Sequence, residues 1–245
     1  MSAPRLFPSL PLPLVETGRI VCVGVLLDGD PADWIAAATP FATAGEITRA
    51  KRFVHAKDAA RHLVGRALAR RVLSASLARP LGDFPPGPWG KPGVTGVSPF
   101  GTPAIDFSLS HSGDVVLAAF CRDAAVGVDV ELSRPLPDVL DLASQLHPRE
   151  SAAILAVPPS ERVAAFYRSW TRKEAVLKAL GRGLSLPLDG FVTLSEPAAS
   201  DWLSAPPEGV AFPAAWTTRD VDVGAGRQCS VAATAAGLGL EVFLD

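Results

Sequence analysis

Three strand-like runs joined by short turns constrain the fold of this chain most. Residues 105–132 (IDFSLSHSGDVVLAAFCRDAAVGVDVEL) contain three apolar, β-branched runs. A turn at Ser112-Gly113-Asp114 joins the first two runs, and Arg122-Asp123 opens the turn into the third. The segment therefore predicts three consecutive strands.

Two helical stretches accompany these strands. Apolar residues recur at helical spacing from Thr48, the expected N-cap, to about Leu77 and again over residues 164–180, with a shorter helical segment at 148–155. Further strand-like runs cover residues 20–27, 191–194, 214–223, 229–235 and 240–244, and a Pro/Gly-rich loop covers 82–103. The two long helices share a loose pattern, so we expect an α+β architecture of two related lobes meeting near residues 121–126, with a ligand cleft between them.

Composition places the chain among ordinary globular proteins. Of 245 residues, 48% are hydrophobic and 20% charged, and the net charge is −2. No run reaches the roughly 18 apolar residues needed to span a bilayer, and prolines interrupt the N-terminal apolar run. Cys22, Cys121 and Cys229 are far apart and lack CxxC spacing, which predicts reduced, buried thiols. We expect a cytoplasmic protein that binds no membrane.

Two carboxylates follow one another on the third strand. In Gly127-Val128-Asp129-Val130-Glu131, side chains alternate, so Asp129 and Glu131 share one face. Two charges about 5 Å apart repel by roughly 3 kcal/mol at an effective dielectric near 20, so a close pair favours a cation or a shared proton. A strand with one solvated face is the alternative interpretation.

The second long helix carries an acid and a base on one face. Glu174 and Lys178 are four residues apart, while Trp170 and Leu177 share the packing side. For this motif in isolation, an exposed ion pair worth only a few tenths of a kcal/mol is the favoured interpretation.

A histidine and hydroxyls lie where the first strand enters its turn. Ser110, His111 and Ser112 could present hydroxyls, imidazole and backbone N–H groups to a phosphate. The G-x-S-x-G pattern of a hydrolase nucleophile is missing, and a merely exposed histidine is the alternative.

The first long helix is strongly basic. Between Arg49 and Arg71 it carries eight Lys or Arg residues and one acid, Asp58. This excess suggests a polyanionic ligand or an acidic partner, and a solvated helix face is an equally compatible interpretation. No RNP, helix-turn-helix or zinc-finger pattern is visible, so we expect no nucleic-acid binding.

Together these segments resemble the Sfp-type 4′-phosphopantetheinyl transferases, in order and spacing from about Arg49 to Phe191. The two signature boxes of that family look like GVDVE (127–131) and WTRKEAVLKALGRGLSLPLDGF (170–191). SLSHSG, WGKP and RFVHAKDAARHLVG resemble its other recognisable segments. Five such segments in sequence make the resemblance specific.

The resemblance implies an enzyme of the holo-[acyl-carrier-protein] synthase type. Such an enzyme transfers the 4′-phosphopantetheine group of coenzyme A to a serine of an apo acyl or peptidyl carrier protein, with Mg²⁺ (or Mn²⁺), and releases adenosine 3′,5′-bisphosphate. The carriers of this family serve polyketide, nonribosomal peptide and fatty acid biosynthesis. It also implies a monomeric pseudo-dimer of two similar lobes, 1–122 and 123–245, each a small antiparallel sheet with a long helix, with the active site in the cleft between them.

The resemblance also implies roles for individual residues. The metal would be held by Asp129, Glu131 and Glu174. Catalysis would use Glu174 or Glu131 as the base, together with Lys178 on a phosphate. Coenzyme A would be contacted by Arg49, Arg61, His62, Lys91, Pro92, Ser110, His111, Lys173 and Lys178. The chain departs from a close relative at Glu46, where that protein has lysine, and at His62, where it has threonine.

Three other functions are compatible with parts of the pattern. A Mg²⁺ nuclease also uses paired carboxylates, but it would usually have lysine where this chain has Ser133. A catalytically degenerate module that only binds carrier proteins or coenzyme A would not need Asp129, Glu131, Glu174 and Lys178 intact. A purely structural two-lobe protein would not need this cluster at all.

Overall fold

The computed structural model describes residues 12–94, 105–122, 124–193, 201–205 and 213–245. Its strands are β1 (Arg19–Leu26), β2 (Ile105–Ser112), β3 (Val115–Arg122), β4 (Val126–Leu132), β5 (Val192–Thr193), β6 (Leu203–Ala205), β7 (Thr217–Asp220), β8 (Arg227–Ala233) and β9 (Gly239–Leu244). Its α-helices are α1 (Pro31–Ala38), α2 (Ala44–Ala50), α3 (Ala56–Leu77), α4 (Val139–Ala143), α5 (Pro148–Ala156) and α6 (Arg162–Leu180). The predicted α+β class is therefore confirmed, as are the three strands of residues 105–132.

The strands form three sheets, ordered β2-β3-β1-β9, β4-β8-β7 and β5-β6. Their pairs are antiparallel except β1 with β9, which run parallel. The expectation of purely antiparallel sheets is thus wrong for this pair. A division of the chain at residue 122/123 assigns β9 and its sheet partner β1 to different halves.

Side chains, not a backbone ladder, join the two larger sheets along β2 and β4. Three serines of β2 lie two residues apart and therefore point to the same side. Their Oγ atoms accept hydrogen bonds from backbone N–H groups of β4: Ser108 from Val128 at 3.2 Å, Ser110 from Val130 at 3.2 Å, and Ser112 from Leu132 at 3.1 Å. This serine row sets Ser110 and Ser112 beside the acidic end of β4.

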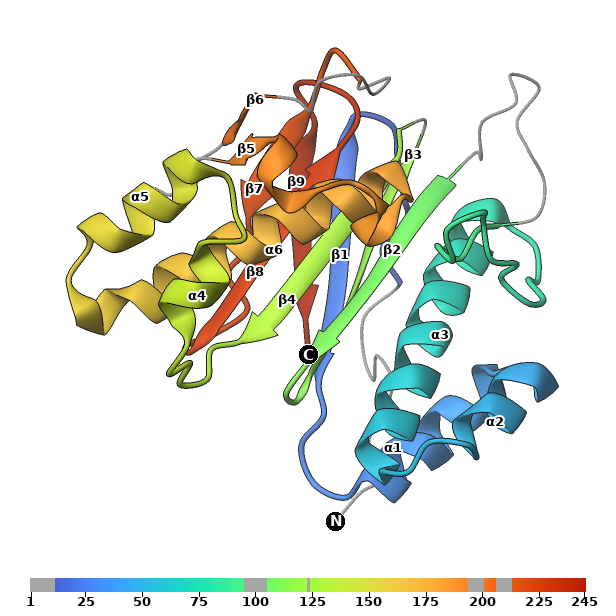
Figure 1. The fold of residues 1–245 in the computed structure, drawn as a ribbon. Coiled ribbons are helices and arrows are strands. Elements are labelled where there is room, and N and C mark those ends of the chain that lie inside the picture. The colour runs from blue at the N-terminus through green and yellow to red at the C-terminus, as the bar shows by residue number, and fades with distance from the viewer. Residues whose placement is uncertain (1–11, 95–104, 123, 194–200, 206–212) are drawn as a thin grey trace.

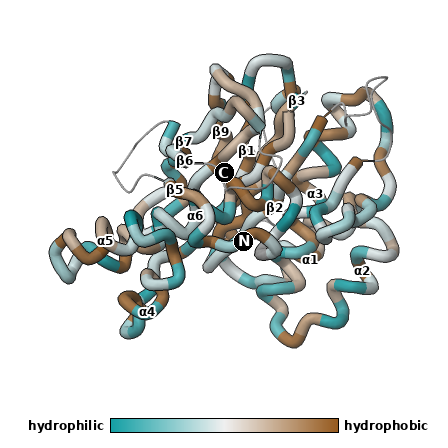
Figure 2. Tube along the Cα trace, turned by 45° about the horizontal axis from the view of Figure 1, so that its top comes forward, coloured by the Kyte–Doolittle hydropathy of each residue, from teal (hydrophilic) through white to brown (hydrophobic). Residues whose placement is uncertain are grey.

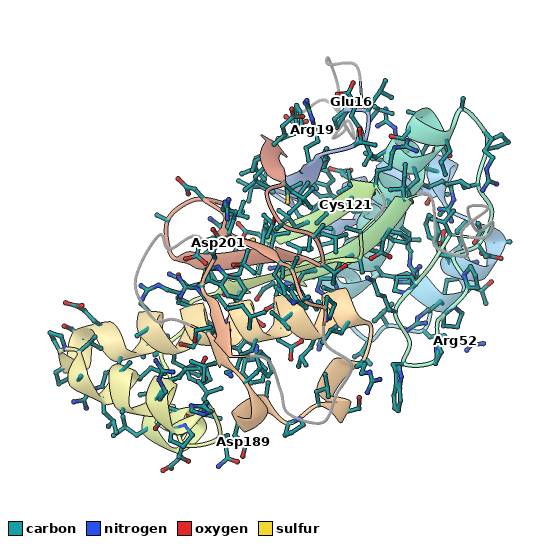
Figure 3. All side chains as sticks on the ribbon, turned by 90° about the horizontal axis from the view of Figure 1, so that it is seen from above. Glu16, Arg19, Arg52, Cys121, Asp189 and Asp201 are labelled. Carbon is teal, nitrogen blue, oxygen red and sulfur yellow. The ribbon has the colours of Figure 1, made fainter. Side chains whose placement is uncertain are left out.

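The long helices cover the sheets that carry the site. Helix α3 runs alongside β2, and α6 crosses β4 and β8 (Figure 1). Leu63, Val64 and Leu68 of α3 are buried with Val116 of β3, and the central strands form the most apolar part of the chain (Figure 2). The three cysteines are buried and not disulfide-bonded, as predicted, and Cys121 lies among the sheet side chains in Figure 3.

The predicted helix from Thr48 to Leu77 is two helices with a break at residues 51–55. Thr43, not Thr48, caps the first of them in a capping box with Glu46, and the Thr48 hydroxyl donates to the Ala44 carbonyl at 2.8 Å. Phe53, an apolar residue within the predicted helix, lies in the break and is 39% exposed. The break lets Ala50 of α2 join the core formed by α3.

The short helix predicted at 148–155 is confirmed as α5. Within the described ranges, none of the helices combines the length and the apolar character that a membrane crossing needs.

Candidate active site

A close crossing of α6 over β4 brings the two signature boxes together. A Cβ atom on Gly127 would lie 2.0 Å from the Ala175 carbonyl oxygen and 2.3 Å from the Ala179 nitrogen. Only glycine therefore allows α6 to lie this near to β4. The crossing sets Lys178 of α6 against Asp129 of β4.

Asp129 is buried in this crossing, with 4% exposure. Its Oδ1 atom accepts hydrogen bonds from Lys178 Nζ at 2.6 Å and from Ser110 Oγ at 2.9 Å. Its Oδ2 atom is buried without a hydrogen-bond partner. The alternative of a solvated strand face is thus wrong for Asp129. A buried carboxylate with one unpaired oxygen is stabilised when that oxygen binds a cation or a proton.

Two further carboxylates experience the charge of Asp129. Burial and the charge of Asp129 raise the pKa of Glu131, although a 2.6 Å hydrogen bond from Ser112 Oγ opposes this shift. Burial, followed by the charges of Asp129 and Glu131, also raises the pKa of Glu174, while Lys178 opposes the rise. The cluster therefore carries more negative charge than Lys178 offsets.

The predicted metal ligands are not preassembled. In the described part of the chain, no group of three or more His, Cys, Asp or Glu side chains is placed to hold a metal ion. The oxygen donors nevertheless fit a hard cation. The Oδ2 atom of Asp129 has no hydrogen-bond partner. The negative charges of Asp129, Glu131 and Glu174 repel one another, and a cation would offset this repulsion. Completing such a site would require these side chains to rearrange.

A cavity of about 380 Å³ opens beside this cluster. Eight of the predicted site residues line it: Arg61, His62, Pro92, Ser110, His111, Asp129, Glu131 and Lys178. Glu174 does not belong to this lining, and Arg66, which sequence reasoning missed, does. The cavity thus has an acidic end on β4 and a basic end on α3.

Lys173, which was predicted to contact coenzyme A, does not line this cavity. Its side chain is fully buried, and its Nζ atom lies 2.7 Å from Glu150 Oε2. The same amine donates to the carbonyls of Leu188 at 2.7 Å and Phe191 at 2.6 Å. Lys173 therefore anchors α6 to α5 and to the segment before β5.

The amine of Lys91 is also used inside the protein. It contacts Asp106 Oδ2 at 2.5 Å and donates to the Val126 carbonyl at 2.9 Å. The Asp106 carboxylate in turn accepts from the Val126 N–H at 2.7 Å. Lys91 thus fixes the start of β4, whereas the adjacent Pro92 reaches the cavity.

The basic helix is not a single free cationic face. Arg70 is buried and forms two 2.9 Å contacts with the carboxylate of Glu46. Arg61 lines the cavity but donates to the Gly113 carbonyl at 2.9 Å and to Asp58 at 2.7 Å. Arg49 is exposed in a separate hollow on α2 beside Phe53. Only part of the predicted positive charge therefore faces the cavity.

The role of Ser108 and Ser112 in joining β2 to β4 was not predicted. The signal was present in the sequence, because serines at 108, 110 and 112 alternate with apolar or ring side chains at the strand period. Ser112 Oγ bridges the two strands, accepting from Leu132 and donating to Glu131.

Comparison with known proteins identifies the family of this chain. A model of the 4′-phosphopantetheinyl transferase superfamily matches residues 125–232, and a model of a 4′-phosphopantetheinyl transferase N-terminal region matches residues 30–122. The chain belongs to this superfamily, and the predicted resemblance to its Sfp type is confirmed.

Several curated relatives carry the same name. The chain is 35% identical over 146 residues to "4′-phosphopantetheinyl transferase Sfp" of Bacillus subtilis, covering 58% of this chain and 62% of that protein. It is 34% identical over 158 residues to the HetI transferase of a Nostoc species, covering 62% and 66%. It is 37% identical over 115 residues to the AcpT transferase of Salmonella typhimurium, covering 46% and 57%. The matches with these relatives span less than two thirds of the relatives' lengths.

Proposed function

We propose that this protein transfers the 4′-phosphopantetheine group of coenzyme A to a serine of an apo acyl or peptidyl carrier protein and releases adenosine 3′,5′-bisphosphate. The reaction class rests on the family. The assignment of this reaction to particular residues rests on one cavity, which has carboxylates and Lys178 at one end and His62, Arg61 and Arg66 at the other. Coenzyme A presents a diphosphate and a separate phosphate monoester, which suit these two ends.

The acidic end would hold Mg²⁺ through Asp129, Glu131 and Glu174, with Mn²⁺ as an alternative ion. The partnerless Oδ2 atom of Asp129 supports this assignment. When bound, the ion would neutralise charge on the diphosphate and make its β-phosphorus more electrophilic.

The protein side chains would supply positioning and proton transfer. In the transfer, the serine oxygen bonds to the β-phosphorus, the bond from that phosphorus to the bridging oxygen breaks, and the bisphosphate leaves. Glu174 or Glu131 would accept the serine proton. Lys178, which now contacts Asp129, would turn to a phosphate oxygen.

The wider arrangement also belongs to the proposal. Residues 1–122 and 123–245 would form two similar lobes of a pseudo-dimer, active as a cytoplasmic monomer, with the cavity between them. The position of the cavity between β2 and α3 on one side and β4 and α6 on the other supports this division.

The test is intact-mass spectrometry of a purified apo carrier protein incubated with this protein, coenzyme A and Mg²⁺. We expect the carrier to gain the mass of one phosphopantetheine group, and EDTA to prevent the gain. Apo carriers from polyketide, nonribosomal peptide and fatty acid biosynthesis should be tried in parallel. No gain with any of them would refute the proposed function.

Two variants sharpen this test. Glu174→Gln keeps the shape of the side chain but removes its charge, so we expect the transfer rate to fall by at least about a hundredfold. Glu161→Gln is the matched control, because Glu161 is exposed at the N-terminus of the same helix. Equal loss in both variants would mean that the site assignment is wrong.

The degenerate binding module remains the second candidate. It predicts coenzyme A binding by calorimetry without any mass gain on carriers. Lys178 and Asp129, held 2.6 Å apart within the cavity lining, favour the active enzyme instead.

A further inference from the structure

The serine row of β2 and the two acids of β4 share one repeating pattern of hydrogen bonds. The three serine Oγ atoms accept backbone N–H groups from alternate residues of β4. A hydroxyl can also donate one hydrogen bond, so each serine has a proton left to give. Ser110 Oγ donates to Asp129 Oδ1 at 2.9 Å, and Ser112 Oγ donates to Glu131 Oε2 at 2.6 Å. In both cases the acid directly precedes the residue whose N–H the serine accepts. The two carboxylates are thus held in the same way, at the period of a β-strand.

Ser108 continues the backbone half of this pattern without the acid. Its Oγ atom accepts the N–H of Val128 at 3.2 Å, as the other two serines accept theirs. The residue directly before Val128 is Gly127, which has no side chain to receive the hydroxyl proton. Ser108 therefore joins the two strands and holds no carboxylate, whereas Ser112 does both. The serine row thus contains its own internal comparison between joining strands and orienting an acid.

Each acid is held through one of its two oxygens. Asp129 Oδ1 accepts from Ser110 and Lys178, while Asp129 Oδ2 has no partner. Among the described residues, Ser112 is the only hydrogen-bond partner of the Glu131 carboxylate, through Oε2. A hydrogen bond to one carboxylate oxygen leaves the other oxygen available to a cation. The rearrangement that a complete metal site requires therefore need not break the serine contact.

We propose that Ser112 is a positioning residue for the metal: its hydroxyl orients the Glu131 carboxylate, which then binds a divalent cation through its other oxygen. This inference rests on the proposed function for the assignment of the metal to Asp129, Glu131 and Glu174. A glutamate side chain loses rotamer freedom when an ion fixes it, and the Ser112 contact imposes part of that order during folding. Ser110 is less suited to a test, because it also contacts Lys178 at 3.0 Å.

The experiment is a Mn²⁺ titration of the full-length protein followed by electron paramagnetic resonance, in which free and bound Mn²⁺ give different signals. Coenzyme A is present throughout, and a titration of coenzyme A alone supplies the blank. Removing a hydrogen-bond partner of a metal ligand typically weakens metal binding by about 10–100-fold. We therefore expect Ser112→Ala to bind Mn²⁺ at least about tenfold more weakly than wild type.

Two further variants separate orientation of the acid from joining of the strands. Ser108→Ala is the matched control, because it removes the same kind of bond to a β4 N–H group and no bond to an acid. We expect it to lose stability in urea denaturation but to bind Mn²⁺ as tightly as wild type. Ser112→Thr keeps the hydroxyl and should bind Mn²⁺ nearly as tightly as wild type. A merely structural role of Ser112 would not separate the two alanine variants in this way.

Unchanged Mn²⁺ affinity in Ser112→Ala, or an equal loss in both alanine variants, would overturn the inference. So would the absence of Mn²⁺ binding by wild type. Should Ser112→Ala fail to fold, Ser112→Cys keeps the size of the side chain with a much weaker donor, and the same comparison applies. Carrier modification by wild type together with unchanged Mn²⁺ affinity in the Ser112 variants refutes only this inference. The expected loss of affinity without any carrier modification by wild type refutes only the proposed function.

Discussion

Replacing Gly127 by alanine tests the view that a backbone contact positions the whole site. The new Cβ atom would lie 2.0 Å from the Ala175 carbonyl oxygen, 2.3 Å from the Ala179 nitrogen and 2.9 Å from the Lys178 carbonyl carbon. A normal contact needs about 3.5 Å, so α6 and β4 must separate by about 1.5 Å. Because these are backbone atoms, no side chain can rotate out of the way.

Two effects should follow from this separation. Overpacking of a core costs typically about 1–3 kcal/mol, and a clash with backbone belongs at the upper end of that range. For a chain of this size, about 3 kcal/mol corresponds to a fall in Tm of roughly 6–12 °C. Lys178 and Glu174 would move with α6, and a misplacement near 1 Å can reduce a rate by about a hundredfold.

The measurements are the free energy of unfolding from urea denaturation and the rate of carrier modification by mass spectrometry. Gly82→Ala is the matched control, because no atom lies within 4 Å of a Cβ built there. We expect this control to stay within about 0.5 kcal/mol of wild type. A Gly127→Ala protein with wild-type stability and rate would refute the role of this crossing.

Three other substitutions have expected outcomes. Lys173→Met leaves the buried carboxylate of Glu150 without its cation, so the free energy of unfolding should fall by about 3–5 kcal/mol. The affinity of the folded variant for coenzyme A, measured by calorimetry, should stay unchanged. A variant with wild-type stability and weakened coenzyme A binding would instead identify Lys173 as a phosphate ligand. Ser112→Ala removes bonds to Leu132 and Glu131 and should cost about 1–2 kcal/mol in urea denaturation; an unchanged midpoint would contradict this. For His62, the folded pKa of about 4 lies below the ordinary 6.5, so the unfolded chain binds more protons between these values. Stability should therefore fall from pH 6.5 toward pH 4 more steeply in wild type than in His62→Gln, by about 1–2 kcal/mol after solvent screening; parallel curves would contradict this.

Local periodicity was enough to predict the parts of the fold that carry Asp129 and Lys178. The turn residues between β2, β3 and β4 and the alternation in residues 127–131 predict both the strands and the shared face of the two acids. The helical spacing of α6 predicts that Glu174 and Lys178 share a face. These predictions need no knowledge of distant contacts.

Features that depend on distant contacts could not be predicted in this way. The parallel pairing of β9 with β1 joins the two ends of the described chain, and no local pattern encodes it. The break at residues 51–55 contains no proline or glycine, so propensity alone continues the helix. It forms because Thr43 and Glu46 cap α2 separately and Ala50 gains a place in the core.

The different fates of Lys173 and Lys178 show what helix geometry adds to a motif. Successive residues on a helix point about 100° apart, so Lys173 faces well away from its neighbour Glu174, whereas Lys178 lies within about 40° of it. If Glu174 faces the ligand, only Lys178 can accompany it. Lys173 then faces the interior and must find an acid there, which is Glu150 of α5. A lysine next to a signature acid is therefore better predicted as a structural cation than as a phosphate ligand.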